Sequence, residues 1–259
     1  MQKDTEKDQP YFIASLERGT MVLETLARNK GPLGLVELAM LTGMTPSTVT
    51  RYAMTLVSLG YVIRDPATKQ FRISPKVLSL GFSLLHNMDL RTRVSSHLLE
   101  AARRLNVGAQ CGILDGTEIV YVERIQMNAI VDLDIPVGSR LPAYCTALGK
   151  VILAFMDREE AEKIIRDSDL VAHTAYTEVN QVNLISSLEA IRKQGFAINQ
   201  QELILGRNAM AAPVFRNGAV EGAVGFSFPF QKEEEAGFEQ NLVEVLKDIS
   251  KKASLTSTP

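Results

Sequence analysis

The side chains best suited to contact a partner molecule lie in one segment, Thr45 to Gly60. Thr45 is a good helix N-cap, Pro46 suits the first helical position and Gly60 suits the C-terminal cap. The apolar positions of this predicted helix form one stripe: Val49, Ala53, Leu56 and Val57. The opposite face carries small hydroxyls and one arginine: Ser47, Thr48, Arg51, Thr55 and Ser58. Short hydroxyls and a guanidinium at a helix N-terminus suit base edges and phosphates in a major groove.

The chain changes from helical to strand periodicity after Gly60. Residues 61–64 and 69–73 predict two strands, joined by a turn at 65–68. Arg64, Lys69 and Arg72 lie around the tip of this hairpin. In the wing of a winged helix-turn-helix, such charges hold phosphate oxygens without reading sequence. The alternative is a three-helix domain with a solvated polar face.

Two other clusters suit the binding of a small molecule. Residues 138–150 lead through Pro142 and several small residues into a predicted helix, whose free N–H groups would receive an anion such as a carboxylate. Residues 199–202 and 206–209 place polar side chains where one strand ends and the next begins. Apolar walls with a few convergent polar groups are usual for a ligand pocket. Ordinary loop capping is the alternative for each cluster.

Catalytic signals are weak by comparison. His86, His97 and His173 are scattered and show no metal-ligand spacing, so no metal or other cofactor is expected. Cys145 precedes a predicted helix and is the one tempting nucleophile. No histidine or acid is placed by sequence to activate it, so a small buried side chain is the simpler interpretation. An enzyme that uses Cys145 or the Asn199–Glu202 cluster on a small acid stays open as an alternative.

The elements that must position these residues fall into two groups. Helical patterns over 13–27, 35–42 and 45–60, followed by the hairpin, predict a winged helix-turn-helix. Pro75 then opens a helical stretch to about Met88 that has no partner nearby in the sequence. We interpret this stretch as a linker helix that pairs with a second copy, and a helix packed on the wing is the alternative. Such a dimer would place two reading helices about one DNA turn apart, ~34 Å.

The remaining residues predict an α+β domain with an antiparallel sheet. Helices are expected over 90–106, 145–156, 158–166, 181–194 and 233–251. Strands are expected over 109–114, 119–125, 130–135, 195–198, 209–215 and 220–228, with Asn217-Gly218 as a hairpin turn.

The composition of the chain is that of an ordinary globular protein. The 259 residues are 46% apolar and 22% charged, with a net charge of −2 and two cysteines. Residues 11–80 carry a charge of +4, whereas residues 81–259 carry −5. The longest apolar run, Val151 to Met156, is far short of the ~20 residues of a membrane span. These features predict a soluble, reduced, cytoplasmic protein without a signal peptide or membrane partner.

Several motifs resemble the IclR family of bacterial transcriptional regulators. Residues 15–19, Ser47-Thr48-Val49-Thr50-Arg51 and Leu59-Gly60-Tyr61 are similar to its DNA-binding half. Residues 146–150, 195–197, Gly206 and 211–214 are similar to its effector-binding half. The resemblance covers residues 13–253 and implies a winged helix-turn-helix, a linker helix and a GAF/profilin-like effector domain with a curved antiparallel sheet. It also implies a dimer, often a dimer of dimers, on a palindromic operator.

The resemblance also implies roles for individual residues. Ala147 and Leu148 match backbone positions that meet the effector, and Ser227 matches a family serine. Members of the family that bind small keto acids have an acidic residue at the position of Asn199 and a cysteine at the position of Ala209. The loss of both argues against glyoxylate or pyruvate as the ligand. Residues 140–146 and Val131-Asp132-Leu133 look closer to the branch that senses protocatechuate and related aromatic acids. That branch usually has Gly-Leu-Arg-Ser where this chain has residues 206–209, and Pro46 replaces a frequent basic residue.

We therefore expect a regulator without enzymatic activity or cofactor that senses a small organic acid, with a constitutive DNA-binding dimer as a further alternative. Its expected parts are a disordered tail (1–10), a DNA-binding domain (11–74), a linker helix (75–89) and an effector-binding and oligomerisation domain (90–259). The expected DNA contacts are Arg18, Ser47, Thr48, Thr50, Arg51, Thr55, Arg64, Lys69 and Arg72. The expected effector contacts are Arg140, Tyr144, Thr146, Ala147, Leu148, Asn199, Glu202, Arg207, Ala209 and Ser227.

Overall fold

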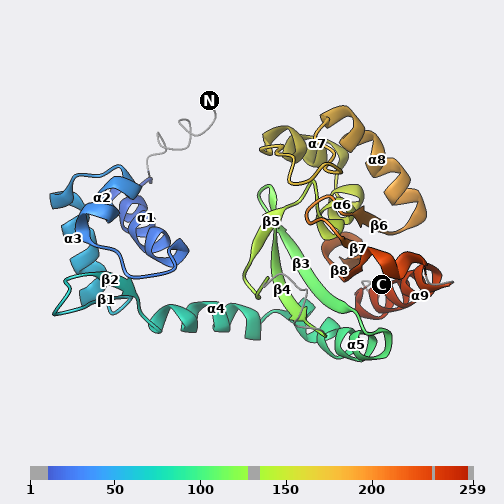
Figure 1. The fold of residues 1–259 in the computed structure, drawn as a ribbon, viewed down its shortest axis with the longest axis horizontal. Coiled ribbons are helices and arrows are strands. Elements are labelled where there is room, and N and C mark those ends of the chain that lie inside the picture. Colours follow the sequence, from blue (N-terminus) through green and yellow to red (C-terminus); the bar gives the residue numbers. More distant parts are fainter. Residues whose placement is uncertain (1–10, 128–134, 235–236, 256–259) are drawn as a thin grey trace. The chain divides into compact units, whose positions relative to one another are not determined.

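The computed structural model of this chain describes residues 11–127, 135–234 and 237–255. Residues 1–87 form one compact unit and residues 88–259 form another (Figure 1). The tail expected over residues 1–10 and the segment Val131–Leu133 lie outside the described residues.

The first unit is a helical bundle with a small hairpin. Its elements are α1 (Ala14–Arg28), α2 (Leu35–Thr42), α3 (Pro46–Ser58), β1 (Val62–Arg64), β2 (Phe71–Ile73) and α4 (Lys76–His86). α3 begins as its sequence predicts, because the Thr45 side chain accepts a hydrogen bond from the Thr48 N–H at 3.3 Å. The apolar stripe of α3 packs against α1, α2 and the hairpin in one core with Val22, Leu26, Leu38 and Phe71.

The hairpin gains a third short segment from the loop after α1. Leu33 and Phe71 exchange both backbone hydrogen bonds, at 2.9 and 2.8 Å. This pairing fixes the hairpin to the helical bundle, so the predicted winged helix-turn-helix is confirmed.

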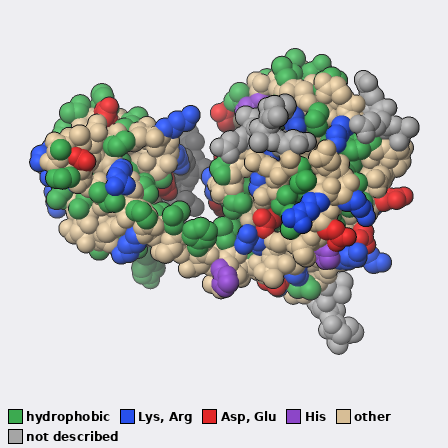
Figure 2. Space-filling model, turned by 60° about the horizontal axis from the view of Figure 1, so that its bottom comes forward, with side chains coloured by type: hydrophobic (Ala, Val, Ile, Leu, Met, Phe, Trp, Pro, Cys, Tyr) green, Lys and Arg blue, Asp and Glu red, His purple; other side chains and the backbone are tan. Residues whose placement is uncertain are grey.

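α4 differs from the other helices of this unit because none of its residues is buried. Leu78, Leu80, Phe82 and Leu84 are each more than half exposed. Figure 2 shows hydrophobic side chains, in green, at the surface of the segment that joins the two units. An apolar helix without an internal partner is unusual in a soluble unit.

The second unit holds a curved six-stranded sheet with helices on both faces (Figure 1). Its strands are β3 (Gly108–Asp115), β4 (Glu118–Ile125), β5 (Arg140–Pro142), β6 (Ala197–Gln200), β7 (Arg207–Arg216) and β8 (Ala219–Pro229). Its helices are α5 (Asp89–Leu105), α6 (Ala147–Phe155), α7 (Arg158–Asp167), α8 (Gln181–Gln194), the 3₁₀ helix η1 (Phe230–Glu234) and α9 (Phe238–Ala253). The expected α+β class is confirmed.

The sheet is antiparallel throughout, in the order β5-β4-β3-β8-β7-β6. α6 packs against β6, β7 and β8 on one face, with α7 and α8 behind it, whereas α5 and α9 cover the other face. β7 and β8 join through Asn217-Gly218, both at positive φ, as the sequence predicts for a tight hairpin. The face that carries α6 is therefore the one that can hold a pocket beside a helix N-terminus.

Several expected boundaries differ from the structure, including the following three. The strand beside β4 is β5, at residues predicted to be loop, while residues 130–134 of the expected strand lie outside the described residues. The strand predicted from Gly195 begins at Ala197, because Gly195 caps α8 at φ 86°. The helix predicted from 233 begins at Phe238, because Gly237 has φ 78° and separates it from η1. No helix among the described residues combines the length and apolar character needed to cross a membrane.

Candidate DNA-reading surface and ligand pocket

The polar face of α3 divides into side chains that bond to their own helix and side chains directed outward. The Thr50 and Thr55 hydroxyls donate to backbone carbonyls one turn earlier, at 2.7 and 2.8 Å. The Thr48 hydroxyl lies 2.9 Å from that of Thr45. Ser47 and Arg51 are exposed, and the described residues offer their side chains no hydrogen-bond partner. These two side chains are therefore the freest to contact another molecule.

The hairpin presents its cations in two directions. The register pairs Arg64 with Phe71 and Arg72 with Ile63, so Arg64 and Arg72 point to opposite faces of the hairpin. The Arg64 guanidinium lies 5.7 Å from the centre of the Phe71 ring. Lys69, at the tip, has φ 61° and donates from Nζ to the Pro66 carbonyl at 2.6 Å. The remaining predicted contact, Arg18, is exposed on α1, whose next residue, Gly19, packs near Tyr52 of α3.

The turn of the hairpin is held by Asp65. Its carboxylate accepts hydrogen bonds from the Thr68 and Ala67 N–H groups at 2.7 and 2.8 Å. These bonds, that of Thr68 first, hold the pKa of Asp65 below its usual range. The wing tip is thus a fixed turn that positions Lys69.

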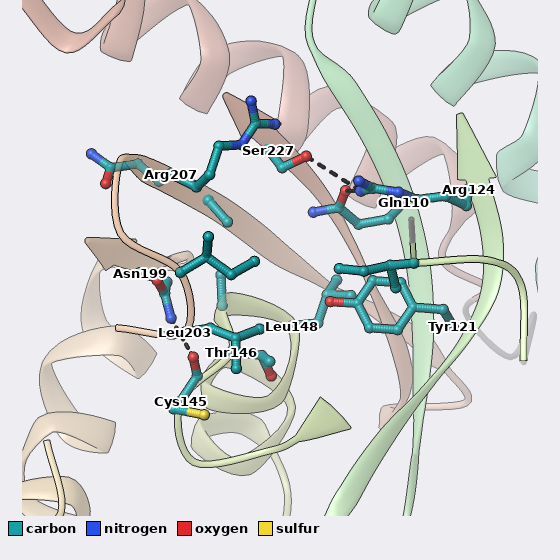
Figure 3. Close-up of a pocket in the computed structure, with 15 residues that line it drawn as sticks. Gln110, Tyr121, Arg124, Cys145, Thr146, Leu148, Asn199, Leu203, Arg207 and Ser227 are labelled. Atoms are coloured by element: carbon teal, nitrogen blue, oxygen red, sulfur yellow. Dashed lines mark hydrogen bonds between the residues drawn. The ribbon is translucent and has the colours of Figure 1, made fainter. Parts of the chain in front are cut away.

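The second unit contains a cavity of about 60 Å³ between the sheet and the start of α6 (Figure 3). Its described lining residues are Gln110, Tyr121, Arg124, Ile135, Cys145, Thr146, Ala147, Leu148, Asn199, Leu203, Ile204, Arg207, Asn208, Ala209 and Ser227. At about 10–15 Å³ for each water-sized group, this space suits a small molecule.

Sheet register explains how residues far apart in sequence meet at this cavity. Across neighbouring strands, Asn199 lies opposite Ala209 and Ala209 lies opposite Ser227. In the adjoining row, Arg124 lies opposite Gln110, which lies opposite Gly225. Residues in register share a face, so both rows point toward α6.

A β-bulge adds Tyr121 to the pocket wall. The pairing of β3 with β4 shifts between Cys111 and Gly112, so that Val122 is the extra residue. Residues three apart in a regular strand point to opposite faces, but this bulge lets Tyr121 and Arg124 both line the cavity. Burial raises the pKa of Tyr121 to about 12, so its hydroxyl keeps its proton and can donate a hydrogen bond.

One wall of the pocket is rich in hydrogen-bond donors. Arg124 Nη1 donates to Gln110 Oε1, and it lies 3.3 Å from Ser227 Oγ. Gln110 is only 3% exposed, and its amide nitrogen points into the cavity (Figure 3). Arg207, half-buried on β7, lies on the same side of the pocket. Guanidinium and amide nitrogens donate hydrogen bonds, so this wall is rich in donors.

The opposite wall is the start of α6. Thr146 caps this helix by accepting from the Gly149 N–H at 3.1 Å. The first N–H groups of a helix lack acceptors within it, and Ala147 and Leu148, the first two residues of α6, line the pocket. A Cβ on Gly149 would lie 2.2 Å from the Ala143 carbonyl oxygen, so only glycine lets the preceding loop approach so closely. Leu148 rests against the sheet at Gly225, where a Cβ would come within 3.2 Å of it.

Buried polar groups behind this wall hold the pocket loop in place. The Asn199 side chain donates to the Cys145 carbonyl and accepts from the Glu202 N–H at 3.2 Å. The Lys150 ammonium pairs with the Glu202 carboxylate, and both side chains are about nine-tenths buried. The loop that carries Leu203 and Ile204 is therefore fixed to α6.

Of the ten expected effector contacts, the structure brings seven together on the pocket wall: Thr146, Ala147, Leu148, Asn199, Arg207, Ala209 and Ser227. The other three lie elsewhere. Arg140 pairs with Asp115 and Glu118 at the exposed end of the β3–β4 hairpin. The Tyr144 hydroxyl donates to the Val171 carbonyl at 2.6 Å, away from the cavity, and Glu202 pairs with Lys150.

The sequence interpretation missed the polar strand residues of the pocket, Gln110, Tyr121 and Arg124. Their signal was a polar or charged residue within a strand that is otherwise buried, at Gln110 above all. Ile135, Leu203 and Ile204 were also missed, since no motif marks them, whereas Asn208 lies within the predicted cluster 206–209.

Cys145 lies at the pocket but is unsuited to nucleophilic catalysis. Burial raises the pKa of its thiol to about 12, with the nearby Glu202 carboxylate adding to the shift. At neutral pH the thiol is therefore almost wholly protonated, and the thiolate is the reactive form. No histidine is found among the described pocket residues.

Family comparisons agree with this arrangement. Residues 82–255 match the C-terminal domain model of bacterial IclR transcriptional regulators, and residues 15–66 match the IclR helix-turn-helix domain model. The chain belongs to the IclR family. It is a DNA-binding transcriptional regulator and not an enzyme, so the alternative of catalysis at Cys145 is set aside.

Individual relatives of this IclR regulator cover most of its length. The Pca regulon regulatory protein of Pseudomonas putida is 30% identical over 239 residues, which span 92% of this chain and 81% of the relative. The HTH-type transcriptional regulator KdgR of Escherichia coli K12 is 31% identical over 222 residues, 85% of this chain and 84% of the relative. The crystal structure of the transcriptional regulator RHA06195 from Rhodococcus sp. RHA1 superposes with a TM-score of 0.80 at 30% identity, and covers 93% of this chain and 97% of that one.

Proposed function

We propose that this IclR regulator changes its affinity for operator DNA when a small organic acid binds in the pocket between the sheet and α6. The donor-rich lining supports this proposal most directly. Carboxylates only accept hydrogen bonds, and the pocket offers guanidinium, amide and hydroxyl donors together with the N–H groups at the start of α6. A carboxylate would accept from the Ala147 and Leu148 N–H groups, where the helix dipole also favours negative charge.

Binding can regulate DNA affinity only if the acid has different affinities for two states of the protein. The loop with Leu203 and Ile204 connects β6 to β7, a long strand that pairs with β6 and β8. A ligand that contacts this loop and α6 together would favour one arrangement of the sheet edge. The linker helix would carry that change to the reading helices.

The proposed acid is aromatic. The pocket offers apolar contacts from Leu148, Leu203, Ile204 and Ile135, together with the planar ring of Tyr121. The relative from Pseudomonas putida is named as a regulator of the Pca regulon, and residues 140–146 resemble the branch that senses protocatechuate-type acids.

The proposed DNA interface centres on Ser47 and Arg51 of α3, whose side chains are exposed and unpaired among the described residues. Its further members are Arg18, Thr48, Thr50, Thr55, Lys69 and one of the two wing arginines, Arg64 or Arg72, which lie on opposite faces of the hairpin. We propose that α4, with four exposed large apolar side chains, pairs with a second copy to form a dimer that can pair again on a palindromic operator. Sedimentation of the full-length chain at micromolar concentration should give a dimer or tetramer, and a monomer would contradict this assembly.

The test of the ligand proposal is thermal unfolding of the full-length protein with a panel of aliphatic and aromatic carboxylates. A ligand at a hundred times its Kd should add about 2.7 kcal/mol, which raises the Tm by several degrees. A compound that stabilises the protein is then titrated into its complex with a duplex that the protein has selected from a random pool. Ligand-dependent DNA affinity supports the proposal. Stabilisation without any change in DNA affinity, or no stabilisation by any acid, contradicts it and favours a constitutive DNA-binding dimer.

A further inference from the structure

Two buried polar groups of the sheet wall reach the cavity without a hydrogen-bond partner among the described residues. Tyr121 is only 6% exposed, and its hydroxyl points into the cavity, toward Leu148 (Figure 3). Gln110 is 3% exposed; its amide oxygen accepts from Arg124, whereas its amide nitrogen points into the same cavity. The described part of the protein therefore leaves one hydroxyl and one amide nitrogen directed at the place of a ligand.

The backbone around Tyr121 holds its ring in a defined place. The Tyr121 N–H donates to the Ser139 carbonyl at 3.0 Å, and the Tyr121 carbonyl accepts from the Gly138 N–H at 2.7 Å. On the other side of β4, Tyr121 lies opposite Gly112 of β3. A Cβ on Gly112 would come within 3.1 Å of Leu148, so the glycine leaves this part of the wall to Leu148 and the tyrosine ring. A recognition group needs such a fixed position.

Both groups act as hydrogen-bond donors toward a ligand. An amide nitrogen only donates, and Tyr121 keeps its proton at neutral pH because burial raises its pKa to about 12. Water can satisfy such donors in a free pocket. A ligand that replaces the water must supply an acceptor, because a buried donor without one costs free energy. An apolar ligand surface at this place is therefore unfavourable, and an oxygen atom is favourable.

We infer that the ligand is a carboxylic acid with a second, uncharged oxygen, a hydroxyl or keto group, to which Tyr121 and Gln110 donate hydrogen bonds. Tyr121 is the specificity-determining residue for this oxygen, because no described residue competes for its hydroxyl. The inference rests on the proposed function, since it concerns the acid that is proposed to bind between the sheet and α6. It adds the requirement for an oxygen on the sheet side of the pocket.

The test compares acids that carry this oxygen with partners in which a methyl group of similar size replaces it. The hydroxyl pairs are 4-hydroxybenzoate with 4-methylbenzoate, 3-hydroxybenzoate with 3-methylbenzoate, and 4-hydroxybutyrate with pentanoate. The keto pair is 4-oxopentanoate with 4-methylpentanoate, and it separates a keto preference from a hydroxyl preference. Affinities are measured by calorimetry on the full-length protein at pH 7 and constant ionic strength.

We expect at least one oxygen-bearing acid to bind roughly tenfold or more tightly than its methyl partner, because the partner leaves two buried donors without an acceptor. Equal affinities within every pair that binds would overturn the inference and leave the proposed function standing. If none of these acids binds, the proposed function fails and the inference fails with it.

The variant Tyr121→Phe assigns the preference to one hydroxyl. It keeps the ring and removes a group that bonds to no described residue, so the Tm should stay unchanged. The preferred oxygen-bearing acid should bind roughly fivefold or more weakly, whereas its methyl partner should change less than about twofold. Tyr176→Phe, at an exposed tyrosine of the same unit, is the control and should leave both affinities unchanged. An equal loss for both acids in Tyr121→Phe, or no loss for either, would overturn the role of Tyr121.

Discussion

The proposed DNA-reading face of α3 and the proposed ligand pocket beside α6 both use polar side chains, but in opposite surroundings. Ser47 and Arg51 are exposed, and the described residues give their side chains no partner. Gln110, Asn199 and Lys150 are buried, and each is held by at least one other polar group. A change on the reading face should therefore alter recognition with little effect on stability, whereas a change in the pocket should alter both.

The two regions should also differ in how the effects of several substitutions combine. Side chains that touch only the partner act independently, so their substitutions should add. The pocket groups share partners. Asn199 is hydrogen-bonded to Cys145 and to Glu202, and Glu202 in turn pairs with Lys150. Substitutions there should couple.

The largest expected effect is on the buried ion pair. Lys150→Met leaves the Glu202 carboxylate buried without its partner, which should cost about 3–5 kcal/mol of unfolding free energy in urea denaturation. The double variant Lys150→Met/Glu202→Gln should lose clearly less, because no unpaired charge remains. Arg158→Met, on an exposed pair of the same unit, is the control and should change stability by less than about 0.5 kcal/mol. If the single variant lost less than about 1 kcal/mol of unfolding free energy, the pocket would be as tolerant of substitution as the reading face.

A smaller effect is expected on the reading face. Arg51→Ala should weaken binding to a selected duplex by about 1–3 kcal/mol, or roughly 5- to 150-fold, with an unchanged Tm. Fluorescence anisotropy at fixed salt measures the affinity, and Arg158→Ala serves as the matched control. Unchanged affinity, or a large fall in Tm, would remove the contrast between the two regions.

The smallest effect concerns the wing. Arg64 and Arg72 point to opposite faces of the hairpin, so at most one of them can approach the phosphates of one duplex face. Single alanine variants at these positions should therefore differ. One should reduce the slope of log affinity against log salt by about 0.9, and the other should leave the slope unchanged. Equal reductions for both would show that the hairpin rearranges on DNA.

The two regions also differed in how far the sequence could predict them. The proposed reading face lies on one helix, where a fixed angle per residue assigns every side chain to a face. The sequence therefore correctly predicted that Ser47 and Arg51 lie on the exposed face of α3. The pocket depends on which strands are neighbours and in what register. Gln110, Arg124 and Ser227 are far apart in the chain and meet only through β3, β4 and β8. Periodicity within a single strand carries no information about this pairing.

Sequence proximity was also a poor guide around the pocket. Tyr144 and Arg140 were expected at the pocket because they precede α6. The short strand β5 instead places Arg140 beside Asp115 at the end of the β3–β4 hairpin, and the Tyr144 hydroxyl donates to the Val171 carbonyl. β5 itself has three residues and ends in Pro142, too little for a strand pattern. By contrast, Thr146, Ala147 and Leu148 were found because a cap followed by a helix is a local signal.

The bulge at Val122 makes the composition of the pocket sensitive to chain length. Deleting one residue there would restore a regular ladder, and every side chain on one side of the deletion would exchange faces of the sheet. Tyr121 would then turn from the pocket toward α5 while Arg124 kept its place. A family that diversifies its ligands can thus replace half of a pocket wall by one insertion or deletion, a change that no single substitution could make.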